Sequence, residues 1–364
     1  MAIGNKQDSP RNSKIHFFGV DTIRFLSAVI VVATHTGFYA PSALRDAFGL
    51  PGRILVALID NFINGQGAVM VFFVVSGLCI HMPQVGGRGQ HWTAFLARRY
   101  LRLGVPFAAA WVISPLLQTQ IFNGVNPLMA ILWTLLLEAL YYTSYPALAL
   151  AARRWGWSKL IWFSLPVSLL LLLSHPEEGH PGKFGTINTT LIYLPVWLLG
   201  CQLAESLAVS SPAMMVSRFQ VWSLRVFMGL SLVISKALIF HAPGFLPPVR
   251  FPLSILVVGF VAGLWLSREL RWCQSHPPFR VLEWCGAWSY SLYLTHLTWF
   301  DVWTRLTKVI AFPAALTPFN FLFQTMFIFA LAACFYYLCE KPSHHFARAA
   351  GLRIDRWLEG QRTS

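Results

Sequence analysis

The feature that most constrains this chain is a succession of apolar segments, each about as long as a membrane crossing. Ten such segments follow one another, near residues 17–39, 64–82, 103–121, 128–150, 159–174, 187–206, 220–241, 250–267, 284–307 and 315–339. A helix needs about 20 residues to cross the hydrocarbon core, and a chain in lipid must satisfy its backbone hydrogen bonds internally. Only 12% of the 364 residues are charged, about half the share in a soluble domain. The sequence therefore predicts an all-α, polytopic transmembrane bundle of about ten spans.

The distribution of basic residues predicts how this bundle sits in the membrane. With ten spans, both ends of the chain lie on one side, and most Lys and Arg residues outside the spans fall on that side. Basic loops stay in the cytoplasm, so we expect both termini to be cytoplasmic. The same rule explains the net charge of +14 without a nucleic-acid partner. We predict a short basic leader at 1–16, one transmembrane domain at 17–340, a basic cytoplasmic tail at 341–364, and an outer loop at 40–63.

The six cysteines predict neither a metal site nor a disulfide framework. They form no Cys-x-x-Cys pair and no Cys/His spacing typical of zinc, and all of them lie in or near the inner halves of the expected spans. Thiols that face the cytoplasm stay reduced. We therefore expect free thiols and no metal cofactor.

The first apolar segment carries three ionisable residues, Asp21, Arg24 and His35. A charged group at the bilayer centre costs about 2.5–3.5 kcal/mol, so such residues mark functional sites by default. Arg24 and His35 are eleven residues apart, which places them within about 20° of each other on a helix and about 16 Å apart along it. A histidine can act as a general base, and an arginine suits a phosphate or a developing anion. The alternative is structural, with an Asp21–Arg24 ion pair and a His35 that bridges helices.

A basic cluster formed by Arg98, Arg99 and Arg102 begins the third expected span. Arg99 and Arg102 share a helical face, where two guanidinium groups could hold phosphates bidentately. The alternative is that these arginines only set the topology of the chain, as the positive-inside rule requires.

Glu138 lies in the middle of the fourth expected span, with Tyr142 near its side of the helix. A carboxylate that is buried alone tends to take up a proton, so we expect Glu138 to face a polar cavity or a cationic partner. One hypothesis is that Glu138 orients the imidazole of His35. The alternative is a structural partnership with Arg24 or another buried base.

Two further segments contain polar or small residues that could line the same cavity. In the ninth expected span, Ser289, Tyr293 and His296 share one stripe, although serine and histidine also link helices by hydrogen bonds. In the second expected span, Ser76 and Gly77 are of the small type that lets helices pack closely. Functional and packing interpretations both remain open for these residues.

These motifs, in this order, resemble the integral-membrane acyltransferase family 3. Seven elements across the chain agree with it: Gly19-Val-Asp-Thr-Ile-Arg-Phe-Leu-Ser-Ala28, Arg24-x10-His35, Phe72-Phe-Val-Val-Ser-Gly77, Arg99-x-x-Arg102, Trp133-Thr-Leu-Leu-Leu-Glu138-Ala-Leu-Tyr-Tyr142, Ser289-Tyr-Ser-Leu-Tyr-Leu-Thr-His296 and Glu340-Lys-Pro342. Each element is short, and only their combination on ten expected spans identifies the family. One departure is Val20, which replaces the usual leucine.

The resemblance implies a multi-pass protein of the bacterial inner membrane that transfers an acyl group, usually acetyl from acetyl-CoA, to a carbohydrate hydroxyl. The acceptor would be a lipid-linked sugar, an O-antigen, an exopolysaccharide or a similar glycan. The expected partners are this glycan and membrane lipids, and the oligomeric state is left open. By the same resemblance, His35 is catalytic and Glu138 supports it, whereas the donor phosphates bind Arg24, Arg98, Arg99 and Arg102. The residues expected to line the cavity are Asp21, Ser76, Tyr142, Tyr293 and His296.

Several alternatives stay open at the level of sequence. His35 either deprotonates the acceptor hydroxyl or carries the acyl group itself. The same fold would also serve a succinyl-CoA donor, or a small-molecule acceptor such as a macrolide or a lipo-oligosaccharide. A rival from another class is a transporter of lipid-linked sugars or protons that uses the same buried charges. Transporters often show duplicated halves, and the sequence shows no such duplication.

Overall fold

The computed structural model describes residues 17–38, 43–85, 91–117, 125–174, 184–209, 216–242, 244, 249–309 and 319–363. Helices account for nearly all of these residues, and no strand occurs among them. The expected all-α fold class is therefore confirmed. The leader expected at 1–16 lies outside the described residues.

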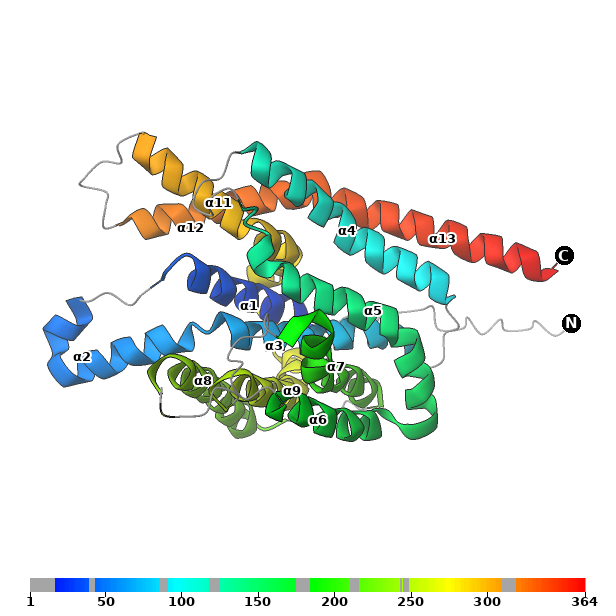
Figure 1. Ribbon diagram of the computed structural model, residues 1–364, viewed down its shortest axis with the longest axis horizontal. Coiled ribbons are helices and arrows are strands. Elements are labelled where there is room, and N and C mark those ends of the chain that lie inside the picture. Colours follow the sequence, from blue (N-terminus) through cyan, green and yellow to red (C-terminus); the bar gives the residue numbers. More distant parts are fainter. Residues whose placement is uncertain are drawn as a thin grey trace, which may run out of the picture.

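Thirteen α-helices follow one another along the described part of the chain (Figure 1). They are α1 (Val20–His35), α2 (Ala43–Phe62), α3 (Gly65–His81), α4 (Trp92–Leu116), α5 (Met129–Trp155), α6 (Trp157–Leu173), α7 (Gly185–Val209), α8 (Arg218–His241), α9 (Ser254–Ser275), α10 (Arg280–Gly286), α11 (Ser289–Val309), α12 (Asn320–Phe335) and α13 (Lys341–Thr363). Short 3-10 or π segments join some of them: η1 (Met82–Gln84), η3 (Val249–Leu253) and η5 (Tyr336–Glu340).

The helices form a layered bundle in which α1 and α3 lie in the interior. Figure 1 shows α4 and α13 side by side along one face, with α6, α7, α8 and α9 on the opposite face. Helix α3 packs against α1, α7 and α9, and α1 also packs against α10 and α11. Asp21 and Arg24 of α1 are therefore partly buried among other helices, as intramembrane charges require, whereas His35 at the end of the helix is exposed.

In the part of the chain that the structure describes, five helical segments are long and apolar enough to cross a membrane: Gly65–Gln84, Gly185–Val209, Arg218–His241, Val249–Ser275 and Asn320–Gln361. The pair α5 and α6, which is bent by 116°, would count as a sixth. Helices α1 and α4 also lie where spans are expected, but α1 has only 16 residues and α4 carries three arginines in its first half. A multi-pass membrane protein follows from these helices, whereas about ten spans and two cytoplasmic termini stay predictions.

The outer loop expected at 40–63 is wrong for most of its length, because Ala43–Phe62 form helix α2. The sequence contains Pro51, which argues against a helix interior. In the structure the helix is broken just before it, at Gly49, whose φ of 55° and ψ of −128° are not helical. Pro51 therefore falls in the first turn of a new helical segment, where its missing N–H costs no hydrogen bond.

Helices α3 and α7 pack closely against each other at two glycines. A Cβ atom on Gly77 would lie 2.1 Å from the carbonyl oxygen of Trp197, and one on Gly200 would lie 2.0 Å from that of Val74. Both obstacles are backbone atoms, so no rotamer change can make room. The interpretation as a site of close helix packing is confirmed for Gly77.

Replacing Gly200 by valine is expected to separate α3 from α7 and to destabilise the bundle by more than an ordinary core substitution, which costs about 1–3 kcal/mol. The measurement is the midpoint of thermal unfolding of the detergent-purified protein, followed by size-exclusion chromatography. Gly104→Ala is the matched control, because a Cβ there would meet no atom within 4 Å. Equal midpoints for the two variants would contradict the contact.

The basic tail expected at 341–364 is a helix as far as Thr363. Helix α13 continues from α12 through η5 and lies along α4 (Figure 1). Gly351 allows this approach, since a Cβ there would lie 2.5 Å from the Cγ of Arg98. The Arg98 Nη1–Asp355 Oδ2 ion pair, 2.9 Å long, joins the two helices further along.

Candidate active site

The beginning of α1 is held by a carboxylate from a distant part of the chain. Glu283 of α10 accepts hydrogen bonds from the backbone N–H groups of Gly19 (3.0 Å) and Thr22 (3.1 Å), and from the Thr22 hydroxyl (2.6 Å). A carboxylate at this position satisfies the free N–H groups of the first turn and favours the helix dipole. Gly286 lets α10 approach, because a Cβ there would lie 2.2 Å from the carbonyl oxygen of Asp21. The start of α1, and with it Arg24, is therefore fixed by α10.

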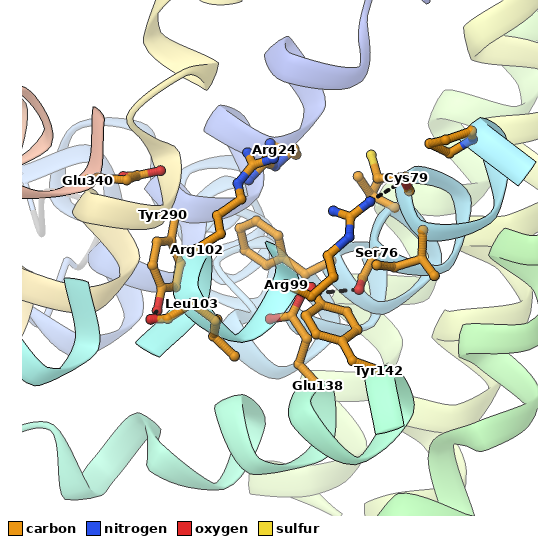
Figure 2. A pocket seen from close by; sticks show the side chains of 14 residues that line it. Arg24, Ser76, Cys79, Arg99, Arg102, Leu103, Glu138, Tyr142, Tyr290 and Glu340 are labelled. Carbon is orange, nitrogen blue, oxygen red and sulfur yellow. Dashed lines mark hydrogen bonds between the residues drawn. The ribbon is translucent and has the colours of Figure 1, made fainter. Parts of the chain in front are cut away.

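Arg24 lines a cavity of about 350 Å³ between α1, α3, α4, α5 and α11. Its Nη1 atom lies 3.6 Å from Asp21 Oδ1, so the ion pair of the structural alternative is present. The guanidinium of Arg24 nevertheless borders the cavity (Figure 2). The other polar residues on its wall are Ser76, Cys79, Arg99, Arg102, Glu138, Tyr142, Tyr290 and Glu340.

The basic cluster of α4 borders two neighbouring cavities: Arg99 and Arg102 line both, and Arg98 lines the second. Arg99 and Arg102 line the cavity of Arg24, which we call the main cavity (Figure 2). Arg99 donates from Nη2 to the carbonyl oxygen of Cys79 at 3.2 Å, and its guanidinium lies 5.7 Å from the ring centroid of Phe95. Arg98 is paired with Asp355 and lines a second cavity next to the first. Three of the four arginines expected to bind the donor are thus brought together.

Glu138 of α5 lies on the wall of the main cavity with a hydrogen-bonding set of its own. It accepts from the Ser76 hydroxyl at 3.1 Å and, by a short hydrogen bond, from the Tyr142 hydroxyl. The Trp197 indole in turn donates to Ser76 at 3.4 Å. Glu138 therefore faces a polar cavity, as expected, but the hypothesis that it orients His35 is not supported by these contacts.

Glu340, at the end of η5, lines the main cavity, although the sequence indicates it only as part of the Glu340-Lys-Pro342 element. It is 1% exposed and accepts from the backbone N–H of Ser291 at 3.0 Å and from the Ser291 hydroxyl at 2.5 Å. His344 Nε2 lies 3.4 Å from its other oxygen. An acidic residue at the end of an apolar helix was the signal available in the sequence. Its partner Ser291 is 49 residues away, which no local pattern indicates.

His35 stands at the other end of α1 and pairs with His296 of α11. Its Nδ1 atom lies 2.7 Å from His296 Nε2, and the two rings are stacked with centroids 5.0 Å apart and planes 6° apart. His296 is fully buried, and its Nδ1 lies 2.8 Å from the carbonyl oxygen of Tyr293. His296, from the polar stripe expected on the ninth span, therefore contacts His35, the catalytic candidate of the first span.

The hydrogen bonds around this pair assign the tautomers of both rings. A carbonyl oxygen only accepts, so Nδ1 of His296 carries the proton that bonds to Tyr293. In a neutral imidazole the other nitrogen is then an acceptor, which makes His35 Nδ1 the donor in the bond between the rings. The lone pair of His35 is left on Nε2. A nitrogen in this state can accept a proton from a substrate hydroxyl.

Tyr293 connects the two ends of the site. Its ring lines a small cavity of about 60 Å³ that also borders Arg24 and Glu138. Its hydroxyl lies 2.6 Å from the Thr134 hydroxyl, while its carbonyl oxygen holds His296. The small cavity, which shares Arg24 and Glu138 with the main cavity, thus borders the residue whose carbonyl oxygen holds His296.

Within the described residues, no three His, Cys, Asp or Glu side chains lie close enough together to hold a metal ion.

The comparison with protein families gives a match. A sequence model of family 3 of the acyltransferases, described as an acyltransferase domain, matches residues 17–339, which is well over half of the chain. The match includes Arg24, His35, the α4 arginines and Glu138. A comparison with curated proteins gives no match, and a comparison with solved structures gives none either. The chain belongs to the membrane acyltransferase family 3.

Proposed function

We propose that this acyltransferase moves an acyl group, acetyl in the simplest case, from acyl-CoA to a hydroxyl group of a carbohydrate acceptor. The acceptor class we favour is a lipid-linked sugar, O-antigen, exopolysaccharide or similar glycan, and the site of action is the bacterial inner membrane. The observation that carries the proposal is the pairing of two features on α1. Arg24 at one end borders a basic cavity, and His35 at the other presents a basic nitrogen.

The negative charge of the acyl-CoA phosphates is complementary to the arginines of the main cavity. Arg24, Arg99 and Arg102 contribute three guanidinium groups to one cavity, and guanidinium groups bind phosphates and thioester oxyanions through charge-assisted hydrogen bonds. CoA is an anion of the cytoplasm, so this cavity opens on the cytoplasmic side in the topology we propose. The pantetheine arm then extends past Tyr293 towards His35, about 16 Å further along α1.

The acceptor meets His35, whose side chain is exposed at the last residue of α1. Nε2 of His35 takes the hydroxyl proton while the acceptor oxygen attacks the thioester carbonyl. The carbon–sulfur bond breaks and CoA leaves as the thiolate. The proton on His35 passes to this thiolate, which yields the ester, the free CoA thiol and the neutral histidine. In the alternative route, His35 Nε2 attacks the thioester carbonyl, the carbon–sulfur bond breaks and CoA leaves as the thiolate. The acceptor hydroxyl then attacks the acyl carbon, the bond from this carbon to Nε2 breaks, and the hydroxyl proton passes to the thiolate, which leaves the neutral histidine.

The test is turnover by the purified protein in lipid nanodiscs with radiolabelled acetyl-CoA. We expect release of CoA thiol, and an acceptor glycan that gains the mass of one acetyl group. Label bound to the protein in the absence of acceptor would select the acyl-histidine route. Failure to release CoA from both acetyl-CoA and succinyl-CoA, with a mixed glycan fraction present, would overturn the proposal, and glycan uptake without CoA release would favour a transporter.

Replacing Glu138 by glutamine is expected to reduce kcat/KM for acetyl-CoA by about tenfold. The change weakens two hydrogen bonds to a charged acceptor, each worth about 1.5–3 kcal/mol when buried, and leaves His35 with its own partner. The measurement is a set of initial rates across a range of pH values. The pH dependence of kcat is expected to keep its wild-type form, and a changed pH dependence would instead support the idea that Glu138 acts on His35.

A further inference from the structure

Helix α13 lies beyond the residues that match the family, and yet it forms part of the wall of a cavity. The second cavity has a volume of about 340 Å³ and lies between α4 and α13. From α4 it is lined by Arg98, Arg99 and Arg102, and from α13 by His344, Ala347 and Arg348. The family match ends at residue 339, and α13 begins at Lys341, directly after Glu340.

The second cavity adjoins the main cavity through a common wall. Ile80, Pro83, Arg99 and Arg102 line both of them. A long ligand can therefore pass from one cavity into the other alongside the two shared arginines. The volumes, about 350 Å³ and about 340 Å³, together suit an extended ligand better than either does alone.

Contacts between α13 and α4 on one side of the second cavity determine the position of α13. Gly351 lies directly on the side chain of Arg98, and Asp355 pairs with the same guanidinium. His344, Arg348, Gly351 and Asp355 are three or four residues apart, so they lie along one face of the helix. Because Asp355 is engaged by Arg98, it neutralises one positive charge at the edge of the cavity and leaves the others on its wall.

The charge of the second cavity points to a ligand group with several negative charges. The lining contains arginines from two helices and the imidazole of His344, and the described residues that line it include no Asp or Glu. Nε2 of His344 is buried and makes no hydrogen bond within the described residues, although it lies 3.4 Å from Glu340. Arg348 is exposed, so a ligand can reach it from the surface of the protein. Such a lining favours phosphate groups.

We propose that α13 forms half of a phosphate site for the nucleotide end of the acyl donor. In this arrangement His344 and Arg348 bind phosphates from one side, Arg99 and Arg102 bind them from the other, and the acyl-pantetheine arm lies in the main cavity. Arg98 has a structural role, because its ion pair with Asp355 holds α13 against α4. This inference rests on the proposed use of acyl-CoA. It adds a second wall to the donor site, formed by residues that the sequence predicts to be a cytoplasmic tail.

The experiment compares acetyl-CoA with acetyl-pantetheine, which carries the same thioester but no phosphate. For Arg348→Ala, the ratio of kcat/KM for acetyl-CoA to that for acetyl-pantetheine is expected to fall about tenfold, which corresponds to about 1.4 kcal/mol. The fall arises in KM rather than in kcat, and Arg348→Lys recovers part of it. Arg353→Ala is the matched control, since Arg353 is exposed on the same helix and does not line the cavity.

A second pair of variants separates phosphate binding from the docking of α13. Asp355→Asn is expected to raise the KM for acetyl-CoA because it frees α13 from Arg98, without a change in the thermal unfolding midpoint of the rest of the bundle. Binding of CoA, 3′-dephospho-CoA and pantetheine to each variant is measured by calorimetry in nanodiscs. We expect the affinity for CoA to fall most in Arg348→Ala and the affinity for pantetheine to change least.

An unchanged ratio in Arg348→Ala, equal to that of Arg353→Ala, would overturn the phosphate site while leaving the proposed function intact. A wild-type protein that turns over neither donor would instead overturn the proposed function. In that event the calorimetry still decides the site, because equal binding of CoA to the wild type and to Arg348→Ala would count against it.

Discussion

Alanine in place of His35 is expected to lower kcat for acyl transfer by about 10²–10⁴-fold, the range that a general acid–base group contributes. The variant loses the Nε2 lone pair that takes the hydroxyl proton, and it loses the nitrogen that would carry the acyl group in the alternative route. The main cavity lies at the other end of α1, so the affinity for CoA should stay close to that of the wild type. The measurement combines initial rates with calorimetric binding of CoA.

Thr34→Ala is the control for this variant. Thr34 precedes His35 on α1 and is exposed, and its hydroxyl donates to the carbonyl oxygen of Ile30 within the same helix. The control is expected to keep most of its activity. Near-normal turnover in His35→Ala would remove His35 from the reaction under either route.

Phenylalanine in place of His296 is expected to reduce kcat by about 10–100-fold, because it removes the acceptor that orients the His35 ring and selects its tautomer. An imidazole held in the wrong tautomer cannot serve as the base, however close it lies to the substrate. Phenylalanine keeps the ring shape, so packing around Tyr293 and Phe72 is disturbed little. We expect the KM for acetyl-CoA to stay unchanged.

A positioning role for His296 is separated from a packing role by two readouts. His296→Gln offers a side-chain oxygen that can accept from His35 Nδ1 and is expected to recover part of the activity. The pH dependence of kcat should differ between the wild type and His296→Phe, because the partner of the titrating base has changed. Equal losses in the glutamine and phenylalanine variants, with an unchanged pH dependence, would show that His296 only fills space.

The sequence predicts the residues of this site better than it predicts their partners. Arg24 and His35 lie on one helix, so their spacing can be read directly, and the structure places them at the two ends of α1. The partners come from far along the chain: His296 is 261 residues from His35, and Glu283 is 261 residues from Thr22. Helical periodicity reports which residues share a face, but it holds no information about which helix that face meets.

The same limit applies to the other contacts between helices. One hypothesis from the sequence pairs Glu138 with His35, and the packing of α3 against α5 adds Ser76 as a contact, while the Tyr142 contact lies within α5. A basic composition indicated a tail at 341–364, where α13 in fact lies on α4. Proline suggested a loop at 40–63, where the break falls at Gly49. Each of these differences arises where tertiary contacts outweigh a local preference.

The carboxylate of Glu283 at the start of α1 makes that helix a fixed spacer between the two halves of the reaction. Because the cap sets where the first turn begins, every later residue on α1 has a determined rotation and height. One residue inserted between Arg24 and His35 would turn the imidazole by about 100° and move it by about 1.5 Å. The histidine would then face away from His296 while the arginine kept its place at the cavity. Donor binding and acyl transfer would be uncoupled, although no residue of the site had been replaced.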